Sequence, residues 1–192
     1  MEALFEEELS EFWRQKIDFV FYDSGPNIGP LNRVILLDCD FFIIPAAYDL
    51  FSVRALKTLG RTLFTWISDW ETISELAPEG SYLLPGKPKF LGYIPQNFTV
   101  YRGGVASEPA RYLGLLDKSI RTEIVEVLKS LGIVHQKSNY QLGQVKDFGG
   151  LVTASQREGV PIFSVSSGTS EQRSTARTAF KAIAEKIVGQ TG

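Results

Sequence analysis

The sequence contains few of the residues on which metal and redox chemistry most often depend. It has one cysteine, Cys39, and one histidine, His135, among 192 residues. A single cysteine excludes an internal disulfide framework and a cysteine-based zinc cluster. A single histidine cannot form a histidine-rich metal site, and we expect His135 to be a surface or capping residue.

Long apolar runs and a strong charge of either sign are also absent. No run of about 18 apolar residues occurs, and the acidic start of the chain does not have the pattern of a signal peptide, so we expect a cytoplasmic protein without a membrane span. Lysine and arginine number 20 against 22 acids, so any DNA contact would need a local basic patch. The composition is that of one globular domain over residues 1–192.

A short apolar stretch, residues 17–23, is the first feature that points to a site. It reads Ile-Asp-Phe-Val-Phe-Tyr-Asp and is followed by glycine, proline and asparagine. This pattern predicts a buried parallel strand that ends at Asp23 and enters a turn. Ligands of open α/β sheets lie beyond the carboxyl ends of strands, so Asp23 could hold a water of hydrated Mg²⁺ beside a phosphate. Alternatively, Asp23 or Asn27 caps the next helix.

The rest of the chain alternates between helical and strand patterns. We expect helices over residues 2–16, 31–37, 52–66, 68–76, 110–131, 151–158 and 170–188, and strands over 41–46, 90–94 and 161–165. Gly132 is the expected C-cap of the helix before it, and Thr169 or Ser170 the N-cap of the last one. Such alternation predicts an α/β fold, a three-layer α/β/α sandwich with a mainly parallel sheet.

Two of these segments resemble a known family. They read Asp18-Phe-Val-Phe-Tyr-Asp23-Ser-Gly-Pro26-Asn-Ile-Gly29 and Cys39-Asp40-Phe-Phe-Ile-Ile-Pro45. In this order they resemble the ParA/MinD-type P-loop ATPases, the deviant-Walker class that includes the CobQ/CobB nucleotide-binding proteins. One departure is Gly25, which stands where the family usually has a proline. Residues 90–97 look like the family's strand that ends near the nucleotide base. Residues 144–152 and 160–165 look like its last helix and strand, so the likeness covers roughly residues 15–188.

The resemblance implies a nucleotide site with ATP and Mg²⁺ as ligands. In it, Asp23 would hold the water shell of Mg²⁺, and the turn that begins with Ser24, Gly25 and Pro26 would sense the γ-phosphate. Asn97, with Gln96 second, would contact the base, flanked by the stretch that begins at Pro161. Taken from the residues alone, either amide could instead satisfy a turn.

The sequence does not contain the family's phosphate loop, K-G-G-x-G-K-[ST]. Gly86-Lys87-Pro88 has neither the preceding glycines nor the following hydroxyl, and Ser166-Ser167-Gly168-Thr169 has no lysine. In the family this loop precedes the segment that matches Asp23, so we expect that the N-terminal P-loop portion is missing from this sequence. Phosphoryl transfer depends on the neutralisation of the phosphate charges by the amides and lysine of this loop. We therefore expect no autonomous ATP hydrolysis.

Two functions follow as alternatives. The chain is part of a ParA-type ATPase of the partitioning or cargo-positioning kind, active when upstream sequence or a partner chain supplies the P-loop. Alternatively, it is a P-loop-less scaffold that pairs with a full-length ATPase or a second copy, and its apolar strand at residues 19–21 offers an unpaired edge.

Non-specific DNA binding is a third hypothesis, because the partitioning members of the family that this sequence resembles bind DNA in this way. It would use the cations near the end of the chain, Arg157, Arg173, Arg177, Lys181 and Lys186. Glu171 and Glu185 lie among them, which favours an ordinary solvated helix face.

Overall fold

The computed structural model describes residues 17–25, 28–98, 100–101, 104–105, 107–133 and 137–191, with side chains except at 97–110. The chain divides into two compact units, Met1–Ile35 and Leu36–Gly192. The helix expected over residues 2–16, the capping role considered for Asn27 and the role of His135 lie outside the described residues.

In the first unit, the strand predicted over residues 17–23 does not form. Residues 17–25 have no regular secondary structure, and Phe21 is 70% exposed. The prediction was wrong because an apolar stretch becomes a strand only where a neighbouring strand pairs with its backbone, and no described strand does so here. The aromatic rings of Phe19 and Phe21 stack on each other, with centroids 6.2 Å apart.

Helix α2 (Pro30–Asp38) begins in this unit and confirms the short helix predicted after the turn. Pro30 occupies its first position, where a missing N–H costs nothing. The backbone oxygen of Gly29 accepts from the N–H of Arg33 at 3.1 Å. The last residues of α2 belong to the second unit, in which Leu37 is a buried core residue.

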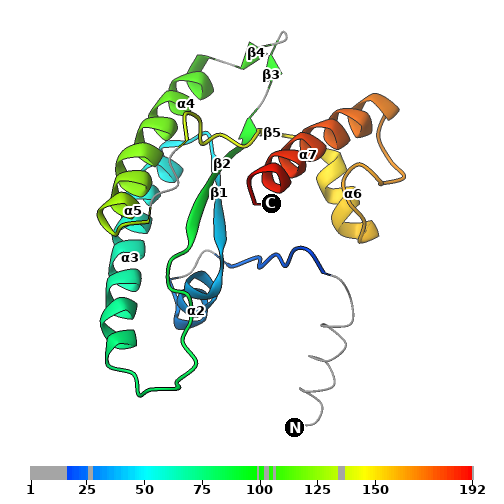
Figure 1. Cartoon of the computed structure of the whole chain (residues 1–192). Helices are drawn as coiled ribbons and strands as arrows, with labels where there is room; N and C mark the ends of the chain where they lie inside the picture. The colour runs from blue at the N-terminus through cyan, green and yellow to red at the C-terminus, as the bar shows by residue number, and fades with distance from the viewer. Residues whose placement is uncertain are drawn as a thin grey trace. The chain divides into compact units, whose positions relative to one another are not determined.

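The second unit is built on a parallel sheet with the strand order β1-β2-β5 (Figure 1). Its strands are β1 (Phe41–Ala47), β2 (Lys89–Phe98) and β5 (Val145–Lys146), which confirms the predicted α/β class. Two short strands, β3 (Val100–Tyr101) and β4 (Gly104–Val105), pair separately and antiparallel. Among the described strands β1 pairs with β2 alone, so Pro45 lies in an edge strand, where a residue without an N–H is tolerated.

The central strand β2 approaches the segment before β5 very closely. The backbone N–H of Tyr93 donates to the oxygen of Tyr140 at 2.9 Å, and the N–H of Leu142 donates to the oxygen of Tyr93 at 3.0 Å. Gly92 has φ of +147°, and a Cβ there would overlap the backbone oxygen of Tyr140. Only glycine suits this position, because it combines that dihedral with the contact.

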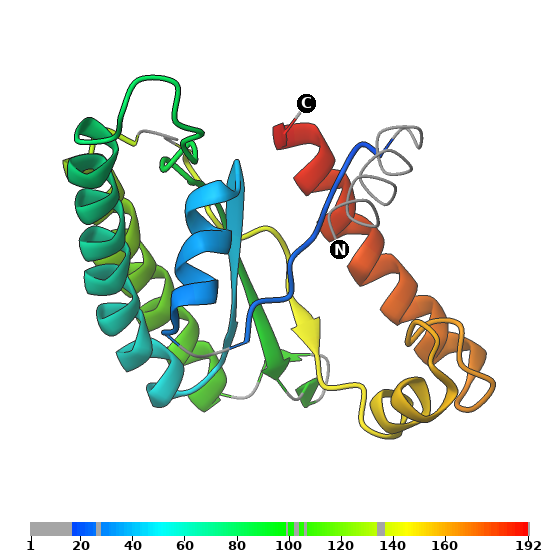
Figure 2. The ribbon, with the colours of Figure 1, turned by 90° about the horizontal axis from the view of Figure 1, so that it is seen from below.

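One face of the sheet is covered by α3 (Leu50–Glu75) and by a long helical segment, as Figure 2 shows. That segment consists of α4 (Ser107–Ser119), the π-helical turn η1 (Ile120–Val125) and α5 (Glu126–Ser130). The buried residues of this layer are Leu37, Ile44, Ala46, Leu56, Leu63, Ile67, Phe90, Tyr93, Leu116, Ile120, Ile124, Val125, Leu128, Ile133 and Tyr140.

Two predictions for this layer have different outcomes. The two helices expected over 52–66 and 68–76 are one continuous helix, α3, because no proline or glycine breaks the chain between them. The helix expected over 110–131 is confirmed, with the π-helical turn inside it, and Gly132 follows it with φ of +72°.

The opposite face of the sheet packs against α7 (Ser170–Thr191). Ile183 and Ile187 of α7 are buried against Leu91 and Leu142, with Phe41 and Ile43 beside them. The helix is capped as predicted, since Thr169 Oγ1 accepts from the N–H of Gln172 at 3.1 Å and Gln172 Oε1 accepts from the N–H of Thr169 at 2.9 Å. Helices therefore cover both faces of the sheet.

A smaller core joins α6 (Gly150–Glu158) to α7. It contains Phe148, Leu151, Ala154, Val165 and Ala176. The strand predicted over residues 161–165 is wrong, because this segment is a turn in which the N–H of Ser164 donates to the oxygen of Pro161 at 2.7 Å. Its apolar residues pack on α6 instead of a strand.

The close approach of α3 to η1 generates a stability prediction. A Cβ at Gly60 would overlap the backbone oxygen of Glu123, which cannot move without disturbing the π-helical turn. We expect Gly60→Ala to lower the free energy of unfolding by about 1–3 kcal/mol. Gly114→Ala in α4 is the control, because a Cβ there has open space. The better helix propensity of alanine should raise the free energy of unfolding by about 0.5–1 kcal/mol. Urea unfolding measures both, and equal effects would contradict the proposed contact.

Candidate functional site

The carboxyl ends of the three parallel strands lie at one edge of the sheet, the usual ligand edge of such folds. After β1, Asp49 caps α3, with its Oδ1 accepting from the N–H of Ser52 at 2.6 Å. The hydroxyl of Ser52 accepts in turn from the N–H of Ala47 at 3.2 Å. After β5, Asp147 Oδ1 accepts from the N–H of Gly149 at 2.7 Å. The turns after β1 and β5 are thus both held by polar side chains.

A hydrogen bond ties the residue after β1 to the residue before β5. The hydroxyl of Tyr48, a buried side chain, donates to Oε1 of Gln144 at 3.3 Å. Burial raises the pKa of Tyr48 above its ordinary value, so the hydroxyl keeps its proton and stays a donor. Gln96 of β2 pairs with Val145 of β5, next to this link.

The charges of this edge suit hydrogen bonding more than phosphate binding. Asp49 and Asp147 are acidic, and Lys146 lies over the ring of Phe148, 5.4 Å from its centroid. The amides Gln96 and Gln144 offer both donors and acceptors. Such an edge can bind the polar rim of a base or sugar hydroxyls, while the neutralisation of several phosphate charges needs cations from elsewhere.

A second polar group links the middle of β2 to the helical segment that covers it. The hydroxyl of Tyr93, whose side chain is 1% exposed, donates to Asp117 Oδ1 at 3.2 Å. Arg121 Nε donates to Asp117 Oδ2 at 3.0 Å, and its NH2 group reaches the backbone oxygen of Ser138 at 3.2 Å. Burial first, and then the charge of Asp117, raise the pKa of Tyr93. This network ties β2 to the helix and to the loop before β5.

Sequence reasoning did not identify these polar links, although part of the signal was present. Asp117 and Arg121 stand at i,i+4 spacing, a pattern for an ion pair, and Asp49 three residues before Ser52 is an N-cap pattern. Nothing local linked Tyr93 to Asp117 or Tyr48 to Gln144, because these partners are far apart in the chain and meet only through the sheet.

The predicted nucleotide-site residues are spread over both units. Asp23, Ser24 and Gly25 are exposed residues of the first unit, and Pro26 lies outside the described residues. Gln96 and Asn97 lie in β2, with the side chain of Asn97 outside the description, and Pro161 is exposed in the turn after α6.

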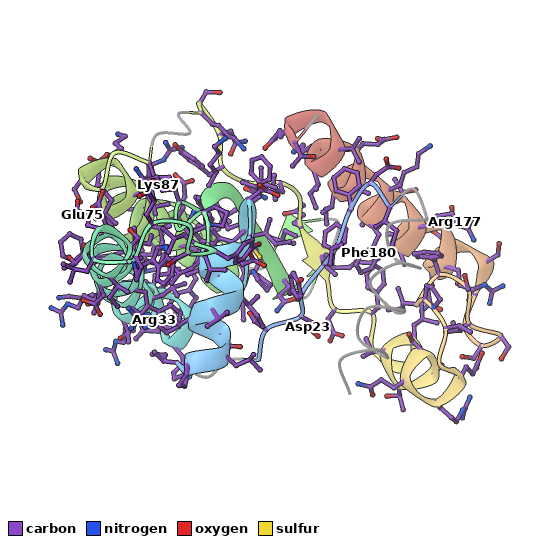
Figure 3. All side chains as sticks on the ribbon, turned by 60° about the horizontal axis from the view of Figure 1, so that its bottom comes forward. Asp23, Arg33, Glu75, Lys87, Arg177 and Phe180 are labelled. Carbon is purple, nitrogen blue, oxygen red and sulfur yellow. The ribbon has the colours of Figure 1, made fainter. Side chains whose placement is uncertain are left out.

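The five cations considered for DNA each have a partner within the chain. Arg173 donates to the backbone oxygens of Ser167 and Gly168, both at 2.9 Å. Arg177 lies over the ring of Phe163 at 5.1 Å, and Figure 3 shows it on α7 with Phe180. The others, Arg157, Lys181 and Lys186, contact Glu158, Glu185 and the backbone oxygen of Gln141. These partners favour an ordinary solvated helix face over a DNA-binding surface, as the sequence also did.

Two further findings concern only the part of the chain that the structure describes. No group of three or more histidine, cysteine, aspartate or glutamate residues there could hold a metal ion. None of its helices has the length and apolar character needed to cross a membrane.

Comparison with known proteins shows the fold alone. The structure is similar to the crystal structure of protein DIP2308 from Corynebacterium diphtheriae, with a TM-score of 0.56 and 19% sequence identity. The match covers 95% of this chain and 52% of that one, so this chain spans about half the length of that protein. No family model matches the sequence, and neither does any curated protein.

The buried tyrosine predicts how stability depends on alkaline pH. Because the pKa of Tyr93 is raised in the folded state, the unfolded chain loses this proton first, and stability should fall above about pH 10. Phenylalanine at position 93 cannot ionise, so the Tyr93→Phe variant should lose less stability at alkaline pH than the parent. At neutral pH its free energy of unfolding should be lower by about 1 kcal/mol, because the hydrogen bond to Asp117 is lost. Chemical unfolding at several pH values measures this. Tyr82→Phe, at an exposed side chain, is the control, and identical pH profiles for Tyr93→Phe and the parent would refute the assignment.

Proposed function

We propose that this chain is part of a ParA/MinD-type ATPase and contributes the base-contacting edge of its nucleotide site. The P-loop would come from upstream sequence or from a partner chain. The observation that carries the proposal is the polar carboxyl edge of a parallel sheet, with an amide at the end of its central strand and few cations beside it. Such an edge suits a base and leaves the phosphates to another element.

Each residue then has a stated role. Asn97, with Gln96 second, hydrogen bonds the base, since an amide can donate and accept at once. In the proposal, Asp23 holds a water of Mg²⁺, and Ser24, Gly25 and Pro26 respond to the γ-phosphate. The turn at Pro161 flanks the base. A cytoplasmic location and assembly with a second copy or a P-loop chain belong to the same proposal.

Nucleotide titration of the purified chain tests the proposal. If the chain contacts the base and not the phosphates, adenosine and MgATP should bind with similar, weak affinities in the range of about 1 mM. Chemical-shift changes in an NMR titration should centre on β2 and β5. Gln96→Ala and Asn97→Ala should weaken the binding of both ligands about equally.

Asp23→Ala separates the two halves of the proposed site. The substitution should leave adenosine binding unchanged. It should weaken MgATP binding only when a second polypeptide that carries the P-loop is present. Ser130→Ala, in α5 and away from the strand ends, is the control. MgATP binding at least about tenfold tighter than adenosine binding by the chain alone would show a phosphate site in this chain and overturn the division of roles. No binding of either ligand would overturn the base contact.

A second function is favoured by the exposed apolar residues of the first unit. Ile17, Phe19, Val20, Phe21 and Tyr22 are all exposed, and consecutive apolar residues put apolar side chains on both faces of an extended chain. That pattern belongs to a strand covered on both faces. A scaffold that pairs through this stretch with a full-length ATPase, or with a second copy, would cover it.

Sedimentation velocity tests the scaffold function. Phe19→Ser with Phe21→Ser should abolish self-association, or the binding of a ParA-type ATPase, without changing the unfolding transition, because both residues are exposed. Phe51→Ser is the matched control, as Phe51 is 82% exposed and lies on α3. Association that survives the double substitution would exclude this surface.

A further inference from the structure

A second exposed apolar surface lies at the end of α3 and on the segment that follows it. It consists of Ile73, Leu76, Tyr82 and Leu83, and we refer to it as the 73–83 surface. Leu76 is 80% exposed and Tyr82 is 89% exposed. Single apolar residues are common on protein surfaces, but a group of large ones marks an interaction site.

The segment after α3 leaves the helix at its C-terminal end and turns towards β2 (Figure 1). The indole N–H of Trp70 donates to the backbone oxygen of Leu84 at 3.2 Å, and a Cβ at Gly86 would overlap the Trp70 ring. A turn, in which the N–H of Ser81 donates to the oxygen of Pro78 at 3.1 Å, reverses the chain. Ile73 follows Trp70 by three residues and shares its side of the helix. Leu83, beside Leu84, therefore returns to the same end of α3.

The stretch of chain that carries this surface is acidic. Between residues 62 and 86 the chain has no lysine or arginine, and its charged residues are Asp69, Glu71, Glu75 and Glu79. Glu71 and Glu75 are exposed and stand at i,i+4 on α3, a spacing at which like charges repel. Figure 3 shows Glu75 and Lys87, the cation at which this stretch ends. The surface combines apolar side chains with the negative charges of Glu71, Glu75 and Glu79, although the whole chain carries a net charge of only −2.

The charge decides between the occupants that could cover this surface. Residues 1–16 contain five glutamates against Arg14 and Lys16, so like charge disfavours the chain's own first segment. A second copy would place the same acids opposite each other, because a two-fold interface is self-complementary. We propose that the 73–83 surface docks a basic segment of a partner protein, in which lysine or arginine flanks leucine-type anchors. This inference is independent of the proposed nucleotide function.

The test uses a labelled synthetic peptide of lysine and leucine residues at helical spacing and follows binding to the full chain by fluorescence anisotropy. Leu76→Ser with Tyr82→Ser removes the apolar anchors, and Glu71→Gln, Glu75→Gln and Glu79→Gln together remove the acids. We expect each set to weaken peptide binding about tenfold or more, as for central interface residues. The side chains are exposed, so the unfolding transition should not change.

Matched controls make the test specific. Phe51→Ser removes an equally exposed apolar residue from the other end of α3, and Glu126→Gln, Glu171→Gln and Glu185→Gln together change the net charge by the same amount elsewhere. Both should leave binding within about twofold, the size of a small surface effect. The proposal is overturned if the control sets weaken binding as much, if a glutamate and leucine peptide of the same spacing binds equally well, or if the lysine peptide does not bind.

Discussion

The parallel pairing of β2 on both of its edges is the constraint on which the second unit depends. On one edge β2 pairs with β1 from Phe41 to Ala47, and on the other with the segment that leads into β5. A strand paired on both edges has satisfied backbone groups, so it can be buried, and both of its faces then need apolar cover. The helices α3 and α4 through α5 supply one cover and α7 the other. The absence of a side chain at Gly92 lets the backbone of Tyr140 come close enough to pair.

The same pairing brings the polar residues together at the strand ends. Three parallel strands place their carboxyl ends at one edge, so the turns after β1 and β5 come beside the end of β2. Hydrogen bonds from Tyr48 and Tyr93 then join segments that are distant in the chain. The resulting edge is polar and holds little positive charge, which is why we propose that it contacts the base of a nucleotide and that another element binds the phosphates.

Two apolar surfaces point to association, and they differ in chemistry. The apolar residues of 17–22 are exposed and have no regular secondary structure, so backbone pairing with another sheet would satisfy this stretch. The 73–83 surface lies beside the exposed acids Glu71, Glu75 and Glu79, which is why we propose a basic segment as its partner. The stacking of Phe19 on Phe21 covers only part of the first surface. In both proposals, the protein works within an assembly.

Local sequence patterns determined the class of the fold and most of its elements. Apolar periodicity predicted β1, β2, α2, the α4 to α5 segment and α7, and the Thr169 cap followed from its neighbours, because these depend on residues a few positions apart. Tertiary structure alone decided whether an apolar stretch became a strand. Residues 41–47 found a partner in β2, whereas residues 17–23 and 161–165 did not, since backbone pairing needs a neighbour that no local pattern supplies. For the same reason, the links from Tyr48 to Gln144 and from Tyr93 to Asp117 arose only when the sheet brought distant segments together.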